Sequence, residues 1–167
     1  MPSSTCGFLG GVTDEVHFTA TFPTKRMAAD CLFRDQAGRV LVLDPPYKAT
    51  WDLPGGAVER DESPRQAAQR EVQEELGLVV EPGALLAVEW VPQLGDFTEV
   101  VAFIFDGGVL TPSDIDRFAL DPTEASTFRF VPLTDAEHLL EPNQYARVTA
   151  ALNASTTAYL ENGSRPL

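Results

Sequence analysis

Residues 56–78, GAVERDESPRQAAQREVQEELGL, join an acidic loop to an amphipathic helix and decide how the chain folds. Ser63 is a good helix cap, Pro64 fits the first turn, and Gln66 completes a capping box. Gly77 is a natural helix stop. The sequence therefore predicts a helix between Ser63 and Gly77.

This helix has an apolar side and an acidic side. At roughly 100° per residue, an apolar stripe can pack while three carboxylates gather about a quarter-turn away. The stripe is Ala68, Val72 and Leu76, and the carboxylates are Glu71, Glu74 and Glu75. Each like-charged pair costs roughly 0.2–0.5 kcal/mol, and Arg70 alone cannot neutralise three glutamates. We therefore expect a further positive partner.

Two explanations fit the acidic side of this helix. A generic glutamate-rich helix exposes its carboxylates to solvent. Clustered carboxylate oxygens also suit a hard divalent cation, magnesium or manganese, better than a soft metal. The order of residues around the helix decides between these explanations.

Gly56, then Glu62 after five residues, then REVQEELGL at 70–78 after seven more, resembles the complete Nudix box. The resemblance implies a Nudix hydrolase, a pyrophosphohydrolase that splits a nucleoside diphosphate linked to another moiety. It also implies a fold of the α/β (α+β) class, an αβα sandwich around a mixed β-sheet. The cofactor implied is Mg²⁺ or Mn²⁺.

The resemblance assigns roles to residues in and next to the box. It implies a metal site formed by the carbonyl of Gly55 with the carboxylates of Glu71, Glu74 and Glu75. Glu71 is both a ligand and a possible base. Arg70 is expected to pair with Glu62, which fixes the loop, so Arg70 acts by orienting the site. The residues predicted to serve catalysis are Glu71, Glu75, Arg70 and Glu124.

Glu124 is included because the base in this family often comes from outside the box. Four acidic residues qualify: Glu99, Asp114, Asp116 and Glu124. Glu124 is the first choice because it precedes a predicted strand, where Nudix proteins frequently place an acidic residue. Each of the four is otherwise a solvated surface carboxylate.

Contacts to the substrate are predicted at Lys48, Trp51 and Pro92. Lys48 could touch phosphate, and Pro92 lies near the position where ADP-ribose hydrolases of the family often carry proline. Four aromatic residues could stack on a nucleobase, although aromatic residues beside strands more often belong to the core: Trp51, Trp90, Phe97 and Phe118. Nucleoside triphosphates and nucleotide sugars, including ADP-ribose, both stay open. Neither His17 nor His138 has a convincing catalytic neighbour.

The rest of the chain is consistent with one domain of this fold. Strands are predicted at 28–34, 39–43, 84–91, 97–105 and 127–131, with a hint of another at 16–20. Helices are predicted at 135–140 and 143–159, and a long loop at 109–125. We expect a Nudix domain at 28–160, a peripheral arm at 1–27 and a tail at 161–167.

Composition limits the partners. With 167 residues, 44% of them hydrophobic, the chain suits one well-cored domain. A net charge of -13 argues against a protein that grips a nucleic acid polymer, while a small phosphorylated ligand stays possible because a cation would reverse the local sign. Cys6 and Cys31 are expected to be free thiols. No signal peptide or membrane span is seen, so a cytoplasmic location is expected.

Two alternatives to a hydrolase share the predicted fold. One is a binding module that senses a nucleotide without turning it over, and the other is an enzyme with different chemistry, such as an isomerase. The intact REVQEE run argues against the sensor, because a pure sensor has no need of every metal carboxylate. It also argues against different chemistry, because such relatives usually depart from the box. A homodimer is expected only by analogy with the family.

Overall fold

A mixed β-sheet forms the centre of the computed structural model, which describes residues 21–96 and 98–166. Its strands are β1 (Arg26–Arg34), β2 (Val40–Asp44), β3 (Gly55–Ala57), β4 (Leu85–Val91), β5 (Val100–Val109), β6 (Thr127–Val131) and β7 (Ala158–Glu161). The helices are α2 (Pro64–Leu76), α3 (Pro112–Ile115), α4 (Leu133–Ala136) and α5 (Pro142–Asn153).

The sheet runs in the order β6-β2-β1-β5-β4-β7, and β3 pairs with β1 outside this path. Strand pairs β1–β5 and β4–β7 are parallel, and the others are antiparallel. Strands β2 and β3 therefore pair with different parts of the same edge of β1. Arg34 at its end pairs with β2, while residues 28–30 pair with β3. β3 is thus held beside the first half of β1, directly before the loop that leads into α2.

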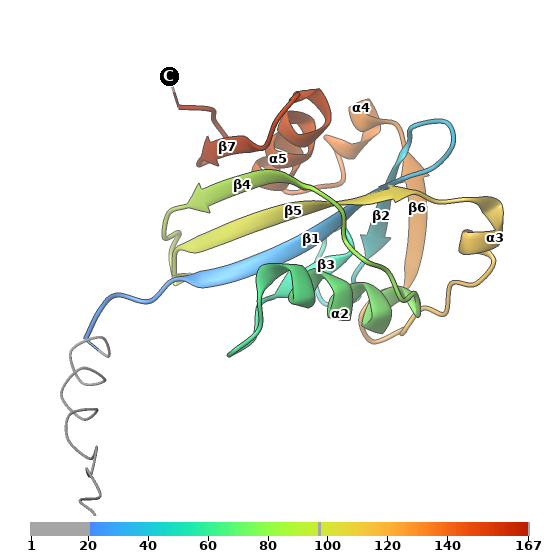
Figure 1. Cartoon of the computed structure of the whole chain (residues 1–167), viewed down its shortest axis with the longest axis horizontal. Helices are drawn as coiled ribbons and strands as arrows, with labels where there is room; N and C mark the ends of the chain where they lie inside the picture. Colours follow the sequence, from blue (N-terminus) through green and yellow to red (C-terminus); the bar gives the residue numbers. More distant parts are fainter. Residues whose placement is uncertain (1–20, 97, 167) are drawn as a thin grey trace, which may run out of the picture.

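Helices cover both faces of this sheet, as Figure 1 shows with α2 on one side and α4 and α5 on the other. The alternation along β1 separates the two cores: Ala29, Cys31 and Phe33 pack with α2, whereas Leu32 packs with α5. The apolar stripe of α2 is buried as predicted. The αβα sandwich with a mixed sheet is therefore confirmed.

The ends of α2 are as predicted. The Ser63 side chain accepts a hydrogen bond from the Gln66 backbone N–H, and the Gln66 side chain accepts one from Ser63, which completes the capping box. Gly77 ends the helix in the left-handed conformation, with φ 69°. Both signals act within a few residues, so the sequence alone was enough to place this helix.

The carboxyl-terminal half departs from the prediction. The helix predicted at 143–159 ends at Asn153, and the chain then forms β7 parallel to β4. The helix predicted at 135–140 is α4, over Leu133–Ala136, and the loop at 109–125 contains α3. β5 runs from Val100 to Val109 rather than ending at Phe105, with a register shift opposite the junction of Leu32 and Phe33. The strand hint at 16–20, His17 and Phe97 lie outside the described residues.

Cys31 is buried with a free thiol, as predicted, and burial raises its pKa to about 12. Cys6 lies outside the described residues. Among the helices of residues 21–96 and 98–166, none has the length and apolar character needed to cross a bilayer.

Candidate active site

The acidic side of α2 faces β3, and a hydrogen bond joins the two elements. Glu75 is only 6% exposed, and its Oε2 accepts a 2.9 Å hydrogen bond from the Gly55 backbone N–H. Glu75 was predicted on the acidic side of the helix, and it lies between that helix and the sheet. Its carboxyl group is therefore held in a fixed place beside the glycine pair.

The two glycines of β3 leave room for neighbouring atoms that a side chain would displace. A Cβ on Gly55 would lie 2.5 Å from the Ala29 carbonyl oxygen, and its φ of 151° also favours glycine. A Cβ on Gly56 would lie 2.5 Å from Glu71 Oε1. The Glu71 carboxyl group therefore rests directly on the backbone of β3, where no side chain intervenes.

Arg70 joins the acidic residues to the loop. Its Nε and Nη2 donate to the two carboxylate oxygens of Glu62 at 3.0 and 3.1 Å, so the predicted pair is present. Its Nη1 donates to Glu71 at 2.8 Å and to Glu74 at 2.9 Å. Its Nη2 also donates to the Ala57 carbonyl oxygen at 2.9 Å. One guanidinium thus fixes the loop and holds two carboxylates of α2, and its own pKa is raised first by Glu62 and then by Glu71 and Glu74.

The carboxyl groups around β3 are electrostatically crowded. The pKa of Glu75 is raised to about 9, chiefly by burial and also by the charges of Glu71, Asp30 and Asp52, and the Gly55 hydrogen bond opposes this rise. Burial also raises the pKa of Glu71, against the lowering effect of Arg70. The local field therefore favours either protonation or a bound cation.

The donor set fits a hard divalent cation. Carboxylate and carbonyl oxygens are the ligands that magnesium and manganese prefer, and a cation would offset the repulsion that raises the Glu75 pKa. As the side chains stand in residues 21–96 and 98–166, no three His, Cys, Asp or Glu residues form one metal-holding group. Arg70 accounts for part of this, since it draws Glu71 and Glu74 to itself. A bound cation would share these two carboxylates with Arg70, which contacts one oxygen of each.

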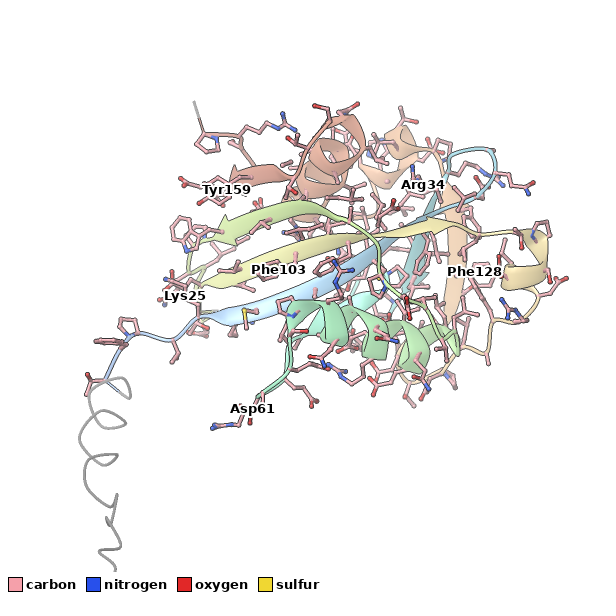
Figure 2. The ribbon with its side chains drawn as sticks, in the orientation of Figure 1. Lys25, Arg34, Asp61, Phe103, Phe128 and Tyr159 are labelled. Carbon is pink, nitrogen blue, oxygen red and sulfur yellow. The ribbon has the colours of Figure 1, made fainter. Side chains whose placement is uncertain are left out.

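A cleft of about 740 Å³ opens beside β3 and reaches α5. Its inner part is lined by Asp30, Asp52, Gly55, Gly56, Gln144 and Arg147. Its rim includes Tyr47 and the basic residues Lys25, Arg26 and Arg60. Figure 2 shows Lys25 where the chain enters β1, and Asp61 at the tip of the loop before α2. The glycine pair beside Glu71 and Glu75 is thus continuous with a cavity large enough for a nucleotide-sized ligand.

Among the predicted substrate contacts, Lys48 lies nearest this cleft, because it forms an ion pair with the cleft residue Asp52. Trp51 is only 9% exposed, and the Arg129 guanidinium lies 4.7 Å from its ring centroid. Pro92 follows the end of β4. Neither Trp51 nor Pro92 is among the residues that line the cleft. The structure therefore places Trp51 and Pro92 outside the lining of the cleft.

The four candidate bases have different surroundings. Glu124 is exposed, and its charge contributes to the raised pKa of Glu71. Glu99 pairs with Lys25 at 2.6 Å, and Asp114 caps α3. Asp116 is exposed at the end of α3, as His138 is beyond α4. Glu124 is therefore the candidate base whose charge acts on the acidic side of α2.

Sequence reasoning missed four polar residues that gather where α5 meets the sheet: Asp30, Glu89, Gln144 and Arg147. Glu89 is 0% exposed and accepts a 2.5 Å hydrogen bond from Arg147 Nη1. The signal was present, since Asp30 and Glu89 are each a single acidic residue inside an apolar strand, AADCLF and LLAVEWV.

Three sets of comparisons bear on this arrangement. A model of the NUDIX domain matches residues 24–152. Among curated proteins, a MutT-like protein of Streptomyces ambofaciens is 45% identical over 51 residues, covering 30% of this chain and 33% of that protein. A diphosphoinositol polyphosphate phosphohydrolase 2 of Rattus norvegicus is 42% identical over 65 residues, covering 38% and 36%. An 8-oxo-dGDP phosphatase of Mus musculus is 42% identical over 97 residues, covering 53% and 28%. These matches span about a third of the length of the curated relatives.

Solved structures share the fold. A MutT protein from Methanosarcina mazei Go1 superposes with a TM-score of 0.63 at 25% identity, covering 78% of this chain and 96% of that one. A UDP-X diphosphatase superposes with a TM-score of 0.65 at 20% identity, covering 90% and 76%. The likeness extends well beyond the residues 56–78 from which the fold was first predicted.

Proposed function

This chain belongs to the NUDIX domain family, and from that premise we propose that it is a hydrolase of phosphoanhydride bonds that requires a divalent cation. Its substrate is a nucleoside diphosphate linked to another moiety, either a nucleoside triphosphate or a nucleotide sugar such as ADP-ribose. Water attacks phosphorus, the bridging P–O bond breaks, and the bridging oxygen leaves with the second product.

The observation that carries this proposal is the placement of Glu71 and Glu75 against the glycine pair of β3. Glu75 bonds to the Gly55 N–H, and Glu71 occupies the space that a Gly56 side chain would need. Both glycines line the cleft. Acidic side chains packed against glycines that line a ligand-sized cavity are expected of a site that neutralises and hydrolyses a diphosphate.

The proposed metal ligands are Glu71, Glu74, Glu75 and the Gly55 carbonyl oxygen. When bound, a magnesium or manganese ion would neutralise phosphate oxygens and make phosphorus more open to attack. The chain's own residues supply position and proton transfer. Arg70 orients Glu71 and Glu74, and it anchors the loop through Glu62.

A carboxylate must take the proton of the attacking water. Glu71 is one proposed base, since burial raises its pKa and makes it a better proton acceptor than an ordinary glutamate. Glu124 is the proposed base from outside the box, supported by its electrostatic influence on Glu71.

The names of the relatives support a broad class of phosphorylated substrates. One relative is named a diphosphoinositol polyphosphate phosphohydrolase and another an 8-oxo-dGDP phosphatase. The names of proteins similar to this chain therefore include both an inositol-based and a nucleotide substrate. The acidic balance of the chain favours small phosphorylated ligands over polymers. We also propose that the protein is cytoplasmic and forms a homodimer.

The test is a phosphate-release screen with and without magnesium. The panel contains nucleoside triphosphates, ADP-ribose, dinucleoside polyphosphates, nucleotide sugars and an inositol pyrophosphate. We expect magnesium-dependent cleavage of at least one nucleotide. Tight binding of one compound with turnover of none would contradict the proposal and favour a nucleotide sensor.

A further inference from the structure

Gly55 is contacted from both faces of the sheet. On the α2 side, its backbone N–H donates to Glu75. The Asp30 side chain lies on the other face, because its neighbours Ala29 and Cys31 in β1 pack with α2 and side chains alternate along a strand. Asp30 pairs with Gly55 in register, and a Cβ on Gly55 would lie 2.6 Å from Asp30 Oδ1. The Asp30 carboxyl group therefore rests against the glycine whose carbonyl oxygen is a proposed metal ligand.

Asp30 is held in place from α5. It is 6% exposed, and the Gln144 side chain donates a hydrogen bond to its carboxyl group. Arg147 Nη2, on the same side of α5, lies 4.0 Å from Asp30 Oδ2. Arg147 is itself fixed, because its Nη1 donates to the buried Glu89 of β4, which also accepts a hydrogen bond from the Gly163 backbone N–H. A chain of contacts thus runs from β4 and the turn after β7, through α5 and Asp30, to β3.

Stability alone does not explain a buried carboxyl group at this position. Replacing a buried ion pair by apolar residues of similar volume is often neutral or stabilising, and Asp30 stands in an otherwise apolar stretch of β1. Its place at the cleft offers a reason, since Asp30, Gln144 and Gly55 all line that cavity. A glycine has no side chain to restrict its backbone. Contacts from Glu75 and Asp30 supply that restriction from opposite faces of the sheet.

We propose that Asp30 is a positioning residue of the metal site, because its carboxyl group, held by Gln144 and Arg147, fixes Gly55 so that this glycine offers its carbonyl oxygen to the cation. The proposal rests on the proposed function, and it gives α5 a part in a site that the box would otherwise form alone. Groups that orient a metal ligand from outside are worth roughly 10–100-fold in metal affinity.

Asp30 carries a charge as well as a shape, and the two effects are separable. Its charge already acts on Glu75, and Arg147 beside it offsets part of that charge. Its contact with Gly55 depends on the shape of the side chain, which asparagine reproduces without the charge. Because the Asp30 carboxyl group touches the proposed ligand directly, we assign its effect to position.

The experiment measures the binding of Mn²⁺ alone to the free protein, through the electron paramagnetic resonance signal of the unbound ion. Asp30→Ala removes the contact with Gly55, and we expect it to raise the Kd for Mn²⁺ by about tenfold. Asp30→Asn keeps the shape and an acceptor for Gln144, so it should raise this Kd by less than about threefold. The matched control is Asp96→Ala in the exposed β4–β5 turn, which should bind Mn²⁺ as wild type does.

Gln144→Leu tests the same idea without changing a charge. It frees the Asp30 side chain on the α5 side, so the Kd for Mn²⁺ should rise by about threefold or more. Arg147 keeps its bond to Glu89 in this variant, so α5 should stay in place and the protein should fold. In turnover assays, the Mn²⁺ concentration for half-maximal rate should shift with the Kd, while the substrate KM at saturating Mn²⁺ stays unchanged. A role in stability alone would lower the melting temperature and leave both metal constants as in wild type.

Each way for the proposal to fail has its own result. If Asp30→Ala and Gln144→Leu both fold and bind Mn²⁺ as tightly as wild type, the assignment of Asp30 is wrong while the metal site stands. Equal losses in Asp30→Asn and Asp30→Ala, with none in Gln144→Leu, would overturn positioning in favour of charge. Wild type that binds no Mn²⁺ would contradict the cation requirement of the proposed function itself, and the role of Asp30 would fall with it.

Discussion

The Gly55 backbone N–H and the Glu75 carboxylate, twenty residues apart, are joined by a 2.9 Å hydrogen bond that connects β3 with α2. This bond gives a buried acidic group a fixed position beside the cleft. The bond lowers the Glu75 pKa, but burial and neighbouring carboxyl groups have the larger effect and raise this pKa to about 9. Glu75 is therefore placed where its charged form needs a stronger partner than the Gly55 N–H, such as a cation.

Glu75→Gln is expected to abolish activity without unfolding the protein. The amide keeps an oxygen for the Gly55 N–H and removes a charge that its surroundings disfavour, so the melting temperature in EDTA should be unchanged or higher. Turnover in saturating magnesium should fall by about 10²-fold or more. The measurement is kcat on the best substrate of the screen together with a thermal melt.

The matched control is Glu81→Gln, which makes the same change at an exposed position after α2. It should leave both kcat and the melting temperature near their wild-type values. Near wild-type turnover by Glu75→Gln at saturating magnesium would show that the metal assignment is wrong.

Gly56→Ala tests whether the empty space over β3 serves Glu71. The added methyl would lie 2.5 Å from Glu71 Oε1, the end of a flexible side chain, so the carboxyl group would move and the backbone would not. We expect a loss of about 10²-fold in kcat/KM, the usual size for a group displaced by an ångström, with a small change in melting temperature. A loss of stability that parallels the loss of activity would instead mean that the glycine serves the fold.

Local signals made α2 and its acidic side predictable, whereas distant pairings hid much of the rest. The Ser63–Gln66 capping box and Gly77 act within the helix itself. β7 depends on parallel pairing with β4, about seventy residues earlier, and a single-segment pattern cannot report that partner. Helix propensity therefore suggested a longer final helix than the sheet allows.

Distant pairing also hid the helical part of the inner cleft, although Asp30 and Glu89 were each visible as an acidic residue inside an apolar strand. An arginine on an amphipathic helix usually faces solvent, so Arg147 gave no signal by itself. Its burial makes sense only beside Glu89, 58 positions earlier in the sequence. Trp51 shows the reverse: it stood close to the box in sequence, yet its ring packs in the core rather than along the cleft.

The pair of Arg70 and Glu62 should stabilise the loop before α2. Arg70 is 27% and Glu62 15% exposed at the side chain, and two nitrogens meet two oxygens, a geometry that lysine cannot reproduce. We expect Arg70→Lys to lower the free energy of unfolding by about 1 kcal/mol. Activity should fall as well, because Glu71 and Glu74 lose their orienting partner.

A double-mutant cycle with Glu62→Gln separates this pair from the other contacts of Arg70. Denaturant unfolding of the two single variants and the double variant should give a coupling energy of at least about 0.5 kcal/mol. Additive effects within error would mean that Arg70 does not hold the loop through Glu62 and that other bonds, such as the one to the Ala57 carbonyl, do so.

Asp35 offers a test of stability against pH at a site remote from the box. Although burial opposes it, hydrogen bonds from the Arg39 backbone N–H and guanidinium hold the Asp35 pKa below its usual value of 3.8. Because the folded-state pKa is lowered, this stabilisation is present above pH 3.8 and is lost as pH falls through the folded pKa. Asp35→Asn should therefore cost about 1 kcal/mol at pH 7, and its difference from wild type should shrink below pH 3.8. The measurement is urea unfolding of both proteins from pH 7 to pH 2.5. Taking the difference between them removes the contribution of the remaining carboxyl groups, which titrate in both proteins. A difference that stayed constant over the range would assign the loss to the shape of the β1–β2 turn instead of the charge on Asp35.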